Sequence, residues 1–450
     1  MKRRTFLQAG AAALGSPLVA PSIVQAQGKR VLTFVPQADI AVLDPVWTTT
    51  YQTRDHGFLV FDTLFGLDAA YNPQPQMAAG ASSDKDGAVW TITLRDGLKF
   101  HDGEPVLARD AAASIRRWGA RDGFGQALLA ATDAIDAPDD KTIVIRLKHP
   151  FPLLPDALAK TPPSMCPIMP ERLARTDPFK QVTEMVGSGP YRYKADERVP
   201  GALVVYERFD GYVPRADGVP EGTSGPKVAH FDRIEWRIMP DPSTVSAALQ
   251  RGEIDWWLAP NADLLPLLRR QSRLKVETTV PTGFVATMRF NQLHPPFDNP
   301  AIRRAIIGAV SQADYMVGMV GTDPALWQEG VGYFCPGTPL ANDAGMQALT
   351  SPRDLDAVKK ALAEAGYKGE KVVLLSPTDI PSAKALAEIS ADLLTRIGMT
   401  VDAQPMDWAT LVQRRAKTDP VDQGGWSLFH TSWSGLDMVN PAGHIFLRAN

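Results

Sequence analysis

The sequence predicts an α/β protein of two lobes, each built around a sheet whose parallel strands are joined by a crossover helix. Two βαβ units carry this prediction, because each combines short apolar strands with a helix of 3.6-residue periodicity. The units are 231–239, 243–250 and 254–258 in the first lobe, and 372–376, 383–397 and 400–404 in the second. A third observation, the mixture of strands, turns and helices between residues 51 and 186, predicts an α+β subdomain inserted into the first lobe.

The first lobe is predicted to begin with a strand over 31–35, followed by a helix over 54–65. Within the insertion, the strand 89–94 is followed by two Asp-Gly turns and by a helix over 108–118. Leu107 stands where a helix usually has a capping Ser or Thr, so Asp110 is the candidate to cap a shortened helix instead. The glycines of 187–191 permit a tight, close-packed turn, which we interpret as structural.

The second lobe is predicted to begin after a hinge at Val280, Pro281, Thr282 and Gly283. Gly283 permits unusual torsions and Pro281 restricts where the chain bends. A strand is expected over 427–431, with Trp426 and Trp433 flanking it. The predicted boundaries are residues 1–26 for a signal peptide, 27–50 and 187–280 for the first lobe, 51–186 for the insertion and 281–450 for the second lobe.

Composition excludes several classes of function. The chain has 450 residues, 44% of them hydrophobic and 22% charged, with a formal net charge of −3. These values are typical of a globular protein, and the sequence has no basic run of the kind that binds nucleic acid. Cys166 and Cys335 lie outside any C-x-x-C spacing, and the seven histidines show no metal-ligand spacing. We therefore expect no metal and no cofactor.

The N-terminus predicts export. Lys2-Arg3-Arg4 precedes a mildly apolar stretch that ends in Val24-Gln25-Ala26, which is the pattern of a twin-arginine signal peptide cleaved near Ala26. An ordinary secretory signal is the alternative. The expected location of the mature protein is the periplasm.

Catalytic motifs give little support for an enzyme. The sequence has no Gly-x-Ser-x-Gly. Ser272-x-x-Lys275 matches a serine-acylation tetrad only by spacing, since its partner motifs are absent. We expect a protein without catalytic residues.

Several segments, in their order and spacing, resemble extracellular solute-binding protein family 5, the dipeptide- and oligopeptide-binding receptors of ABC importers. The segments are Leu94–Pro105, Gly187–Tyr191, Arg208–Tyr212, Gly252–Asp255, Asn291–Ala305 and Ala361–Tyr367. The resemblance implies a two-lobed, type II periplasmic-binding-protein-like fold that closes on its ligand. It also implies a monomer that delivers solute to a permease and ATPase complex. Family chains continue past the equivalent of Asn450 with a return strand, so that segment is expected to be missing here.

The resemblance also implies the site residues. Family members place an aspartate after a Trp-x-x motif to hold the α-amino group of a peptide. In direct register Leu436 stands at that position after Trp433, and Asp437 matches with a shift of one residue. Thr49, Thr50 and Tyr51 match a ligand-contacting loop of the first lobe. The full predicted set of ligand-binding residues is Thr49, Thr50, Tyr51, Phe284, Trp426, Trp433 and Asp437.

The ligand class stays open at this point. A short peptide or peptide-like solute is the first hypothesis. A sugar, opine, aromatic compound or chelated metal is the alternative within the same class of receptor, because Leu436 cannot pair with an ammonium group. An exported hydrolase, and a chaperone or sensor that uses the same fold, are rivals from other classes.

Overall fold

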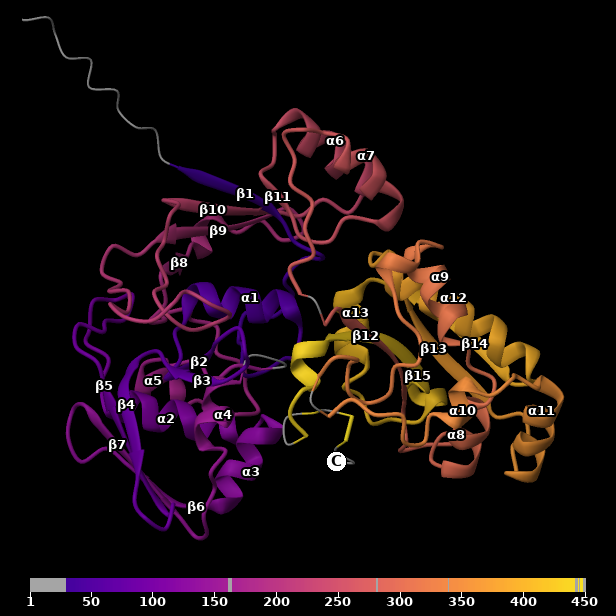
Figure 1. Cartoon of the computed structure of the whole chain (residues 1–450), viewed down its shortest axis with the longest axis horizontal. Coiled ribbons are helices and arrows are strands. Elements are labelled where there is room, and N and C mark those ends of the chain that lie inside the picture. The colour runs from indigo at the N-terminus through magenta and orange to yellow at the C-terminus, as the bar shows by residue number, and fades with distance from the viewer. Residues whose placement is uncertain are drawn as a thin grey trace, which may run out of the picture.

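The computed structural model describes residues 30–160, 164–280, 282–338, 340–441, 444, 446 and 447. Two lobes lie side by side, and the chain passes between them near residue 281 (Figure 1). The predicted signal peptide and Pro281 of the predicted hinge lie outside the described residues. Among the described residues, no helix is long and apolar enough to cross a membrane.

The first lobe contains a five-stranded sheet at its top (Figure 1). In spatial order its strands are β11 (Trp256–Trp257), β1 (Val31–Val35), β10 (Arg233–Arg237), β9 (Leu203–Arg208) and β8 (Tyr191–Tyr193). Helix α6 (Pro242–Arg251) connects β10 to β11, which both run parallel to β1. Gly252 ends α6 in the left-handed conformation. The predicted βαβ unit is therefore confirmed.

Helix α1 (Tyr51–Val60) lies beneath this sheet. Val60 and the adjacent Phe61 share a buried core with Tyr206 and Trp236 of the sheet. The prediction of a helix over 54–65 is wrong at both ends. Phe61 is extended, and the next residue, Asp62, pairs with Ile168 and receives a hydrogen bond from its amide at 3.0 Å. This tertiary pairing ends the helix although the apolar spacing continues.

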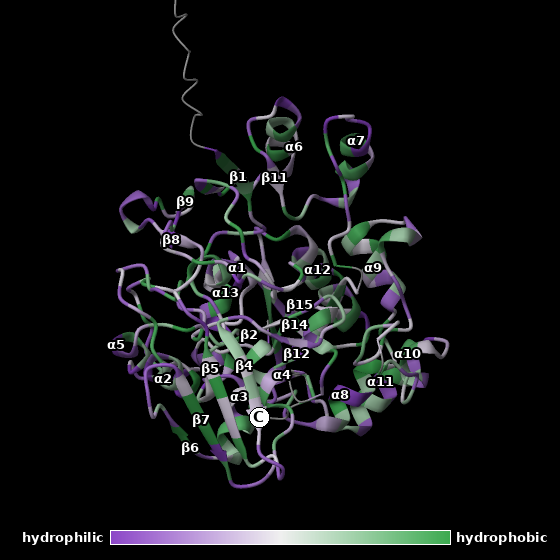
Figure 2. Ribbon diagram, turned by 60° about the vertical axis from the view of Figure 1, so that its left-hand side comes forward, coloured by the Kyte–Doolittle hydropathy of each residue, from purple (hydrophilic) through white to green (hydrophobic). Residues whose placement is uncertain are grey.

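The inserted subdomain is an antiparallel sheet covered by helices. Its strands, in order, are β4 (Ala78–Ser83), β5 (Val89–Leu94), β7 (Thr142–Leu147) and β6 (Thr132–Asp136). The helices are α2 (Ala108–Gly119), α3 (Gly123–Ala131), α4 (Leu154–Ala159) and α5 (Glu171–Ala174), and β2 (Phe65–Leu67) pairs with β3 (Pro73–Pro75) nearby. Figure 2 shows hydrophobic residues concentrated along β5 and β7.

The start of α2 differs from the prediction of a shortened helix, because α2 begins at Ala108 with Leu107 at the N-cap position, and Asp110 is its third residue. The Asp110 carboxylate accepts a hydrogen bond from the Leu107 amide at 2.8 Å, and its second oxygen accepts one from the Glu171 amide at 2.7 Å. Asp110 therefore closes the helix start from its third position, as in one half of a capping box, and also fastens α5 to α2.

The second lobe is a four-stranded sheet with helices mainly on one face. The strands, in order, are β12 (Phe284–Phe290), β15 (Leu428–Ser434), β13 (Lys371–Pro377) and β14 (Thr400–Met406). The helices are α8 (Pro300–Ile307), α9 (Gln312–Val320), α10 (Gln347–Thr350), α11 (Leu355–Glu364), α12 (Pro381–Arg396) and α13 (Trp408–Arg414). Strands β13 and β14 are parallel and joined by α12, which confirms the second predicted βαβ unit.

The two faces of this sheet have different neighbours. Leu374 and Leu428 point into a core shared with α8, α9, α11 and α12. Val373, Leu375 and Phe429 point the other way and pack on α13. In Figure 1, α13, β12 and β15 lie on the side of the lobe that faces the first lobe. The face opposite the main core is therefore the wall of the second lobe that looks toward the first lobe.

The turn at residues 187–191 is packed too closely for any side chain at Gly187. A Cβ atom there would lie 1.9 Å from the carbonyl oxygen of Val60, at the end of α1. Replacing Gly187 by alanine is expected to lower the free energy of unfolding by at least about 2 kcal/mol, since an overpacked contact with backbone cannot relax by rotating a side chain. Urea denaturation measures this. Gly80→Ala in β4 is the control, because its Cβ meets no atom within 4 Å. Equal losses in the two variants would contradict the close-packing argument.

Candidate functional site between the lobes

The site begins with the alternation of side chains along β15. This strand extends to Ser434, three residues beyond its predicted end, so Trp433 lies within it. Phe429, Thr431 and Trp433 share one face, because alternate residues of a strand point the same way. The ladder places Arg289, Thr287 and Val285 of β12 directly opposite them. This face is the wall that looks toward the first lobe.

Tyr51, the first residue of α1, connects the two lobes. Its hydroxyl donates a hydrogen bond to Asp437 at 2.7 Å and accepts one from the backbone amide of Ser434. Its ring meets those of Phe284 and Trp433 edge-on, with centroids 5.7 and 6.4 Å away. One side chain of the first lobe thus contacts the second lobe through polar and aromatic groups together.

Asp437 follows β15 in a short 3-10 turn, Gly435–Met438, and is buried. One carboxylate oxygen accepts from Tyr51, while the other has no hydrogen-bond partner among the described residues. Burial raises the pKa of this carboxyl from its ordinary value of 3.8 to about 7, although the Tyr51 hydrogen bond and the nearby Arg54 both favour the charged form. Asp437 is therefore a buried acid with one oxygen left to accept a further hydrogen bond.

Close packing fixes the position of this turn. A Cβ atom on Gly435 would lie 2.5 Å from the Cys335 sulfur and 2.7 Å from the Thr282 side chain. The Gly435 amide also donates a hydrogen bond to the Gly283 carbonyl at 2.9 Å. Gly283 has φ of +63°, a torsion that favours glycine. The predicted hinge segment thus contacts the turn that carries Asp437.

The two threonines of the loop before α1, Thr49 and Thr50, have different hydrogen-bond partners. The Thr49 hydroxyl accepts a hydrogen bond from Arg415 of the second lobe at 3.3 Å. Thr50 occupies the N-cap position of α1 without capping it, and its hydroxyl lies 3.0 Å from that of Thr53. Thr49 therefore lies at the junction of the lobes, and Thr50 is engaged by its own helix.

Two of the predicted residues differ clearly in their exposure. Phe284 is 53% exposed beside Tyr51, whereas Trp426 is buried elsewhere. The Trp426 ring packs on Phe429 with centroids 5.1 Å apart, in the small core beneath α13, and its indole nitrogen donates to the Lys417 carbonyl. The structure thus brings Tyr51, Phe284, Trp433 and Asp437 together and leaves Trp426 outside that group.

Sequence reasoning missed two arginines on the same wall, Arg289 and Arg415. A signal existed for Arg289, because β12 alternates. Ala286, Met288 and Phe290 pack against the main core, so the intervening positions must face away from it. Arg415 follows α13 and carried no comparable signal, since its position depends on how that helix packs.

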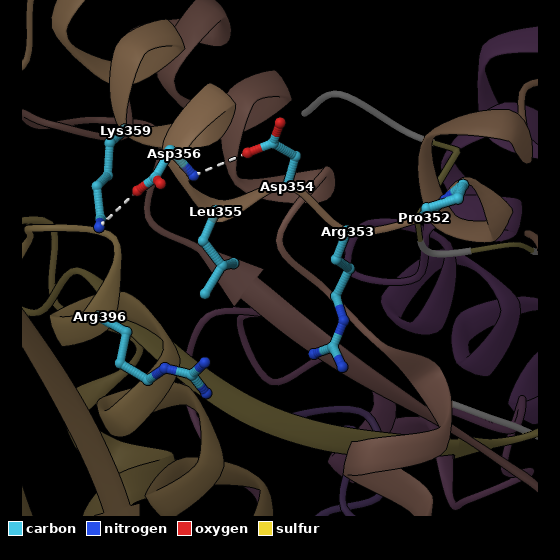
Figure 3. Close-up of a pocket in the computed structure, with 7 residues that line it drawn as sticks. All are labelled: Pro352, Arg353, Asp354, Leu355, Asp356, Lys359 and Arg396. Atoms are coloured by element: carbon cyan, nitrogen blue, oxygen red, sulfur yellow. Dashed lines mark hydrogen bonds and ion pairs between the residues drawn. The ribbon is translucent and has the colours of Figure 1, made fainter.

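A hollow on the surface of the second lobe is less suited to binding a ligand than the residues between the lobes. An open hollow of about 790 Å³ lies on the second lobe near the start of α11 and the end of α12 (Figure 3). Its cations have acidic neighbours: Arg353 pairs with Asp314 at 2.6 Å and Lys359 with Asp356 at 3.0 Å.

Among the described residues, no group of three or more His, Cys, Asp or Glu side chains could hold a metal ion. Cys166 and Cys335 are both buried with free thiols.

The lobes, the crossing segment and the aromatic, acidic wall between them define a two-lobed solute-binding protein. Residues 72–445 match the family model of the bacterial extracellular solute-binding proteins, family 5 (middle region). The chain belongs to this family. The predicted family, the type II periplasmic-binding-protein-like fold class and the function of a solute-binding protein are thereby confirmed. Proteins of this family act outside the cytoplasm.

Two relatives show the range of the similarity. The chain is 38% identical to a probable peptide ABC transporter periplasmic-binding protein, y4tO, of Sinorhizobium fredii, over 100% of this chain and 85% of that protein. It is 28% identical to the glutathione-binding protein GsiB of Pectobacterium atrosepticum, over 83% of this chain and 68% of that protein.

Solved structures share the fold. DppA of Helicobacter pylori, in complex with the peptide STSA, has a TM-score of 0.74 at 22% identity and covers 93% of this chain and 81% of its own. AgaA of A. tumefaciens R10, in complex with agropinic acid, has a TM-score of 0.71 at 21% identity and covers 90% of this chain and 77% of its own.

The raised pKa of Asp437 predicts a pH-dependent stability. Between about pH 4 and 7 the folded protein keeps a proton on Asp437 that the unfolded chain has released. The free energy of unfolding therefore falls as pH rises through this window, by at most about 1.4 kcal/mol per pH unit. Asp437→Asn cannot ionise, so its stability relative to wild type should increase from pH 5 to pH 8. Thermal unfolding at both pH values measures this. Asp133→Asn, at an exposed position of β6, is the control. A constant difference between Asp437→Asn and wild type would contradict the burial argument.

Proposed function

We propose that this protein is the periplasmic substrate-binding component of an ABC importer and that it binds a short peptide or peptide-like solute between its lobes. The observation that carries the proposal is the oxygen of Asp437 that has no partner in the part of the chain that the structure describes, held in a buried turn beside Tyr51 and Trp433. A buried carboxylate without a full set of donors is costly, and a ligand that supplies a donor removes that cost.

An amine suits this place by its chemistry. A protonated α-amino group offers three hydrogen-bond donors. One of them can reach the free oxygen of Asp437, while the Tyr51 hydroxyl continues to donate to the other oxygen. The rings of Trp433 and Phe284 add faces to which a cation is attracted. This arrangement supports the shifted register, in which Asp437 rather than Leu436 takes the role of the family aspartate.

The named relatives favour a peptide over other solutes. The relative at 38% identity is described as a peptide-binding component, and glutathione, the ligand named for GsiB, is peptide-like. The AgaA complex with agropinic acid shows that this fold also accepts non-peptide ligands. A non-peptide solute is therefore the alternative outcome of the binding tests below.

The remaining parts of the proposal follow the family. The protein acts as a monomer without catalytic activity and delivers its solute to a membrane permease with its ATPase.

The lobes rotate about Val280–Gly283, and ligand shifts an existing equilibrium between open and closed forms toward the closed form. The first lobe comprises 27–50 and 187–280, with 51–186 inserted and 281–450 forming the second lobe. Small-angle scattering should show a smaller radius of gyration with saturating peptide.

Removing the Trp433 ring should weaken peptide binding. We expect Trp433→Ala to raise the dissociation constants of peptides of two to five alanines by roughly 30-fold, because a buried aromatic contact commonly contributes about 2 kcal/mol. Calorimetry measures the constants. Trp256→Ala, on an exposed ring of the first lobe, is the control. Unchanged affinity in a folded Trp433→Ala protein would remove this residue from the site.

Blocking the amine tests the role of Asp437 directly. N-acetylated alanine peptides should bind wild type at least 10-fold more weakly than the free peptides, because an amide cannot supply the charged donors. Asp437→Asn should lose affinity for the free peptides and leave the acetylated ones unchanged. Equal binding of free and acetylated peptides to wild type would contradict the amine assignment and favour a non-peptide solute.

We also propose export by the twin-arginine route, with cleavage after Ala26. Replacing Arg3 and Arg4 together by lysine should abolish export, since this route recognises the arginine pair. Fractionation of cells followed by intact-mass measurement tests both points. Normal export of the variant would indicate the general secretory route, and retention of Met1 in exported protein would contradict cleavage.

A further inference from the structure

His444 is fully buried among aromatic rings of the second lobe. Its ring meets those of Tyr333, Phe334 and Phe446 edge-on, with centroids 6.1, 5.3 and 5.7 Å away. Both nitrogens of the imidazole also make hydrogen bonds. The side chain is therefore enclosed by apolar groups and held at both of its polar atoms.

The partners of the two ring nitrogens define the protonation state of His444. The Tyr333 carbonyl oxygen lies 2.6 Å from Nε2 and can only accept, so Nε2 carries a hydrogen. The Phe446 amide donates to Nδ1 at 3.2 Å, so Nδ1 carries none. This is the neutral imidazole. A second proton, on Nδ1, would point at the Phe446 N–H and replace an attractive contact by a repulsive one.

The surroundings of His444 favour the same neutral form. Burial lowers the pKa of His444 below its ordinary value of 6.5, although the hydrogen bond to the Tyr333 carbonyl favours the charged form. The titratable and charged neighbours on this side of the lobe are Tyr333 and Cys335, Arg289 of β12, and Asp437 of the turn after β15. Arg289 disfavours a second positive charge. Asp437, with a pKa of about 7, supplies little negative charge in the acid range in which the imidazole titrates.

Phe446 connects this histidine to the site between the lobes. Its ring meets that of Trp433 edge-on, with centroids 6.0 Å apart, and the Arg289 guanidinium lies 5.2 Å from its centre. Phe446 is half-buried, so part of the ring stays open to a solute beside Trp433. The backbone amide that carries this ring is the one bound to Nδ1 of His444. His444 itself has no exposed surface, so it can influence a solute only through Phe446.

We propose that His444 is a positioning residue for solute binding, whose neutral ring holds Phe446 against Trp433 and whose protonation releases Phe446 and weakens binding. The inference rests on the proposed function and deepens it, because it adds an apolar contact and a dependence on pH to the same site. The open part of the Phe446 ring suits an aromatic or aliphatic side chain of a peptide.

The first experiment needs no ligand. 4-Fluorophenylalanine placed at position 446 gives a single fluorine resonance, which is followed by NMR from pH 8 to pH 4.5. In wild type this resonance should shift in one step with a midpoint below pH 6.5, as His444 takes up a proton. His444→Asn should abolish the step, because the amide oxygen can accept from the Phe446 N–H and cannot be protonated. His444→Gln should resemble acidified wild type at pH 8, because it keeps a donor for Tyr333 but places no acceptor at the position of Nδ1.

Two further variants are the controls for this titration. Asp437→Asn should keep the step, which excludes the other acid-range group on this wall as its origin. His149→Asn, at an exposed position, makes the same substitution elsewhere and should also keep it.

The second experiment tests the link to the solute. Calorimetry uses peptides of two to five residues that contain one phenylalanine among alanines. At pH 7.5, Phe446→Ala and His444→Gln should each raise the dissociation constant of the tightest-binding peptide by about fivefold or more, because an aromatic contact is lost. At pH 4.5 wild type should lose about fivefold more affinity than His444→Asn. Both proteins retain Asp437, so its own titration cancels in this comparison.

The outcomes separate this inference from the proposed function. A step that survives in His444→Asn, or no step in folded wild type, would overturn the inference whether or not a peptide binds. A step that depends on His444, without binding of any peptide, would support the positioning of Phe446 and overturn the peptide ligand. Equal peptide binding by wild type and His444→Gln would leave the receptor intact and overturn the role of His444 in binding. If His444→Gln does not fold, Phe446→Ala and the wild-type pH profile decide.

Discussion

The hydroxyl of Tyr51 is the contact on which the arrangement of the site depends. It donates to Asp437 and accepts from the Ser434 amide, and thus joins the start of α1 in one lobe to the end of β15 in the other. Because the contact is desolvated, each of these hydrogen bonds costs more to break than it would in water. The aromatic neighbours, Phe284 and Trp433, contact the same ring. Polar and aromatic contacts between the lobes therefore meet at one side chain.

The hydrogen bonding of Asp437 is incomplete. Among the described residues, one of its carboxylate oxygens has no hydrogen-bond partner although the side chain is buried. A protein that maximised only its own stability would pair or remove such a group, since isolated buried charges are unfavourable. The unpaired oxygen is explained if a bound solute supplies the missing donor. Specificity then arises because a solute that lacks such a donor leaves the oxygen unpaired.

Local patterns were sufficient to predict much of the fold. The unit β13–α12–β14 was recognisable because strand and helix periodicities alternate cleanly, and α6 because Gly252 marks its end. The end of α1 was not predictable, since Asp62 leaves the helix to pair with Ile168, more than a hundred residues away. The partnership of Tyr51 with Asp437 spans 386 residues and has no local signal. Trp426 and Trp433 looked equivalent beside one strand, and only the packing of α13 distinguishes them.

The same geometry explains how ligand could favour closure without breaking the contact that already joins the lobes. Tyr51 uses one oxygen of Asp437, so an ammonium group can bind the other and add to the closed form. A ligand shifts such an equilibrium only by the difference between its affinities for the two forms. In the open form Asp437 would be separated from Tyr51 of the first lobe and surrounded by water, where charged contacts are weak. Closure brings the two groups together and excludes water, so a contact between the ligand and Asp437 contributes most when the lobes meet.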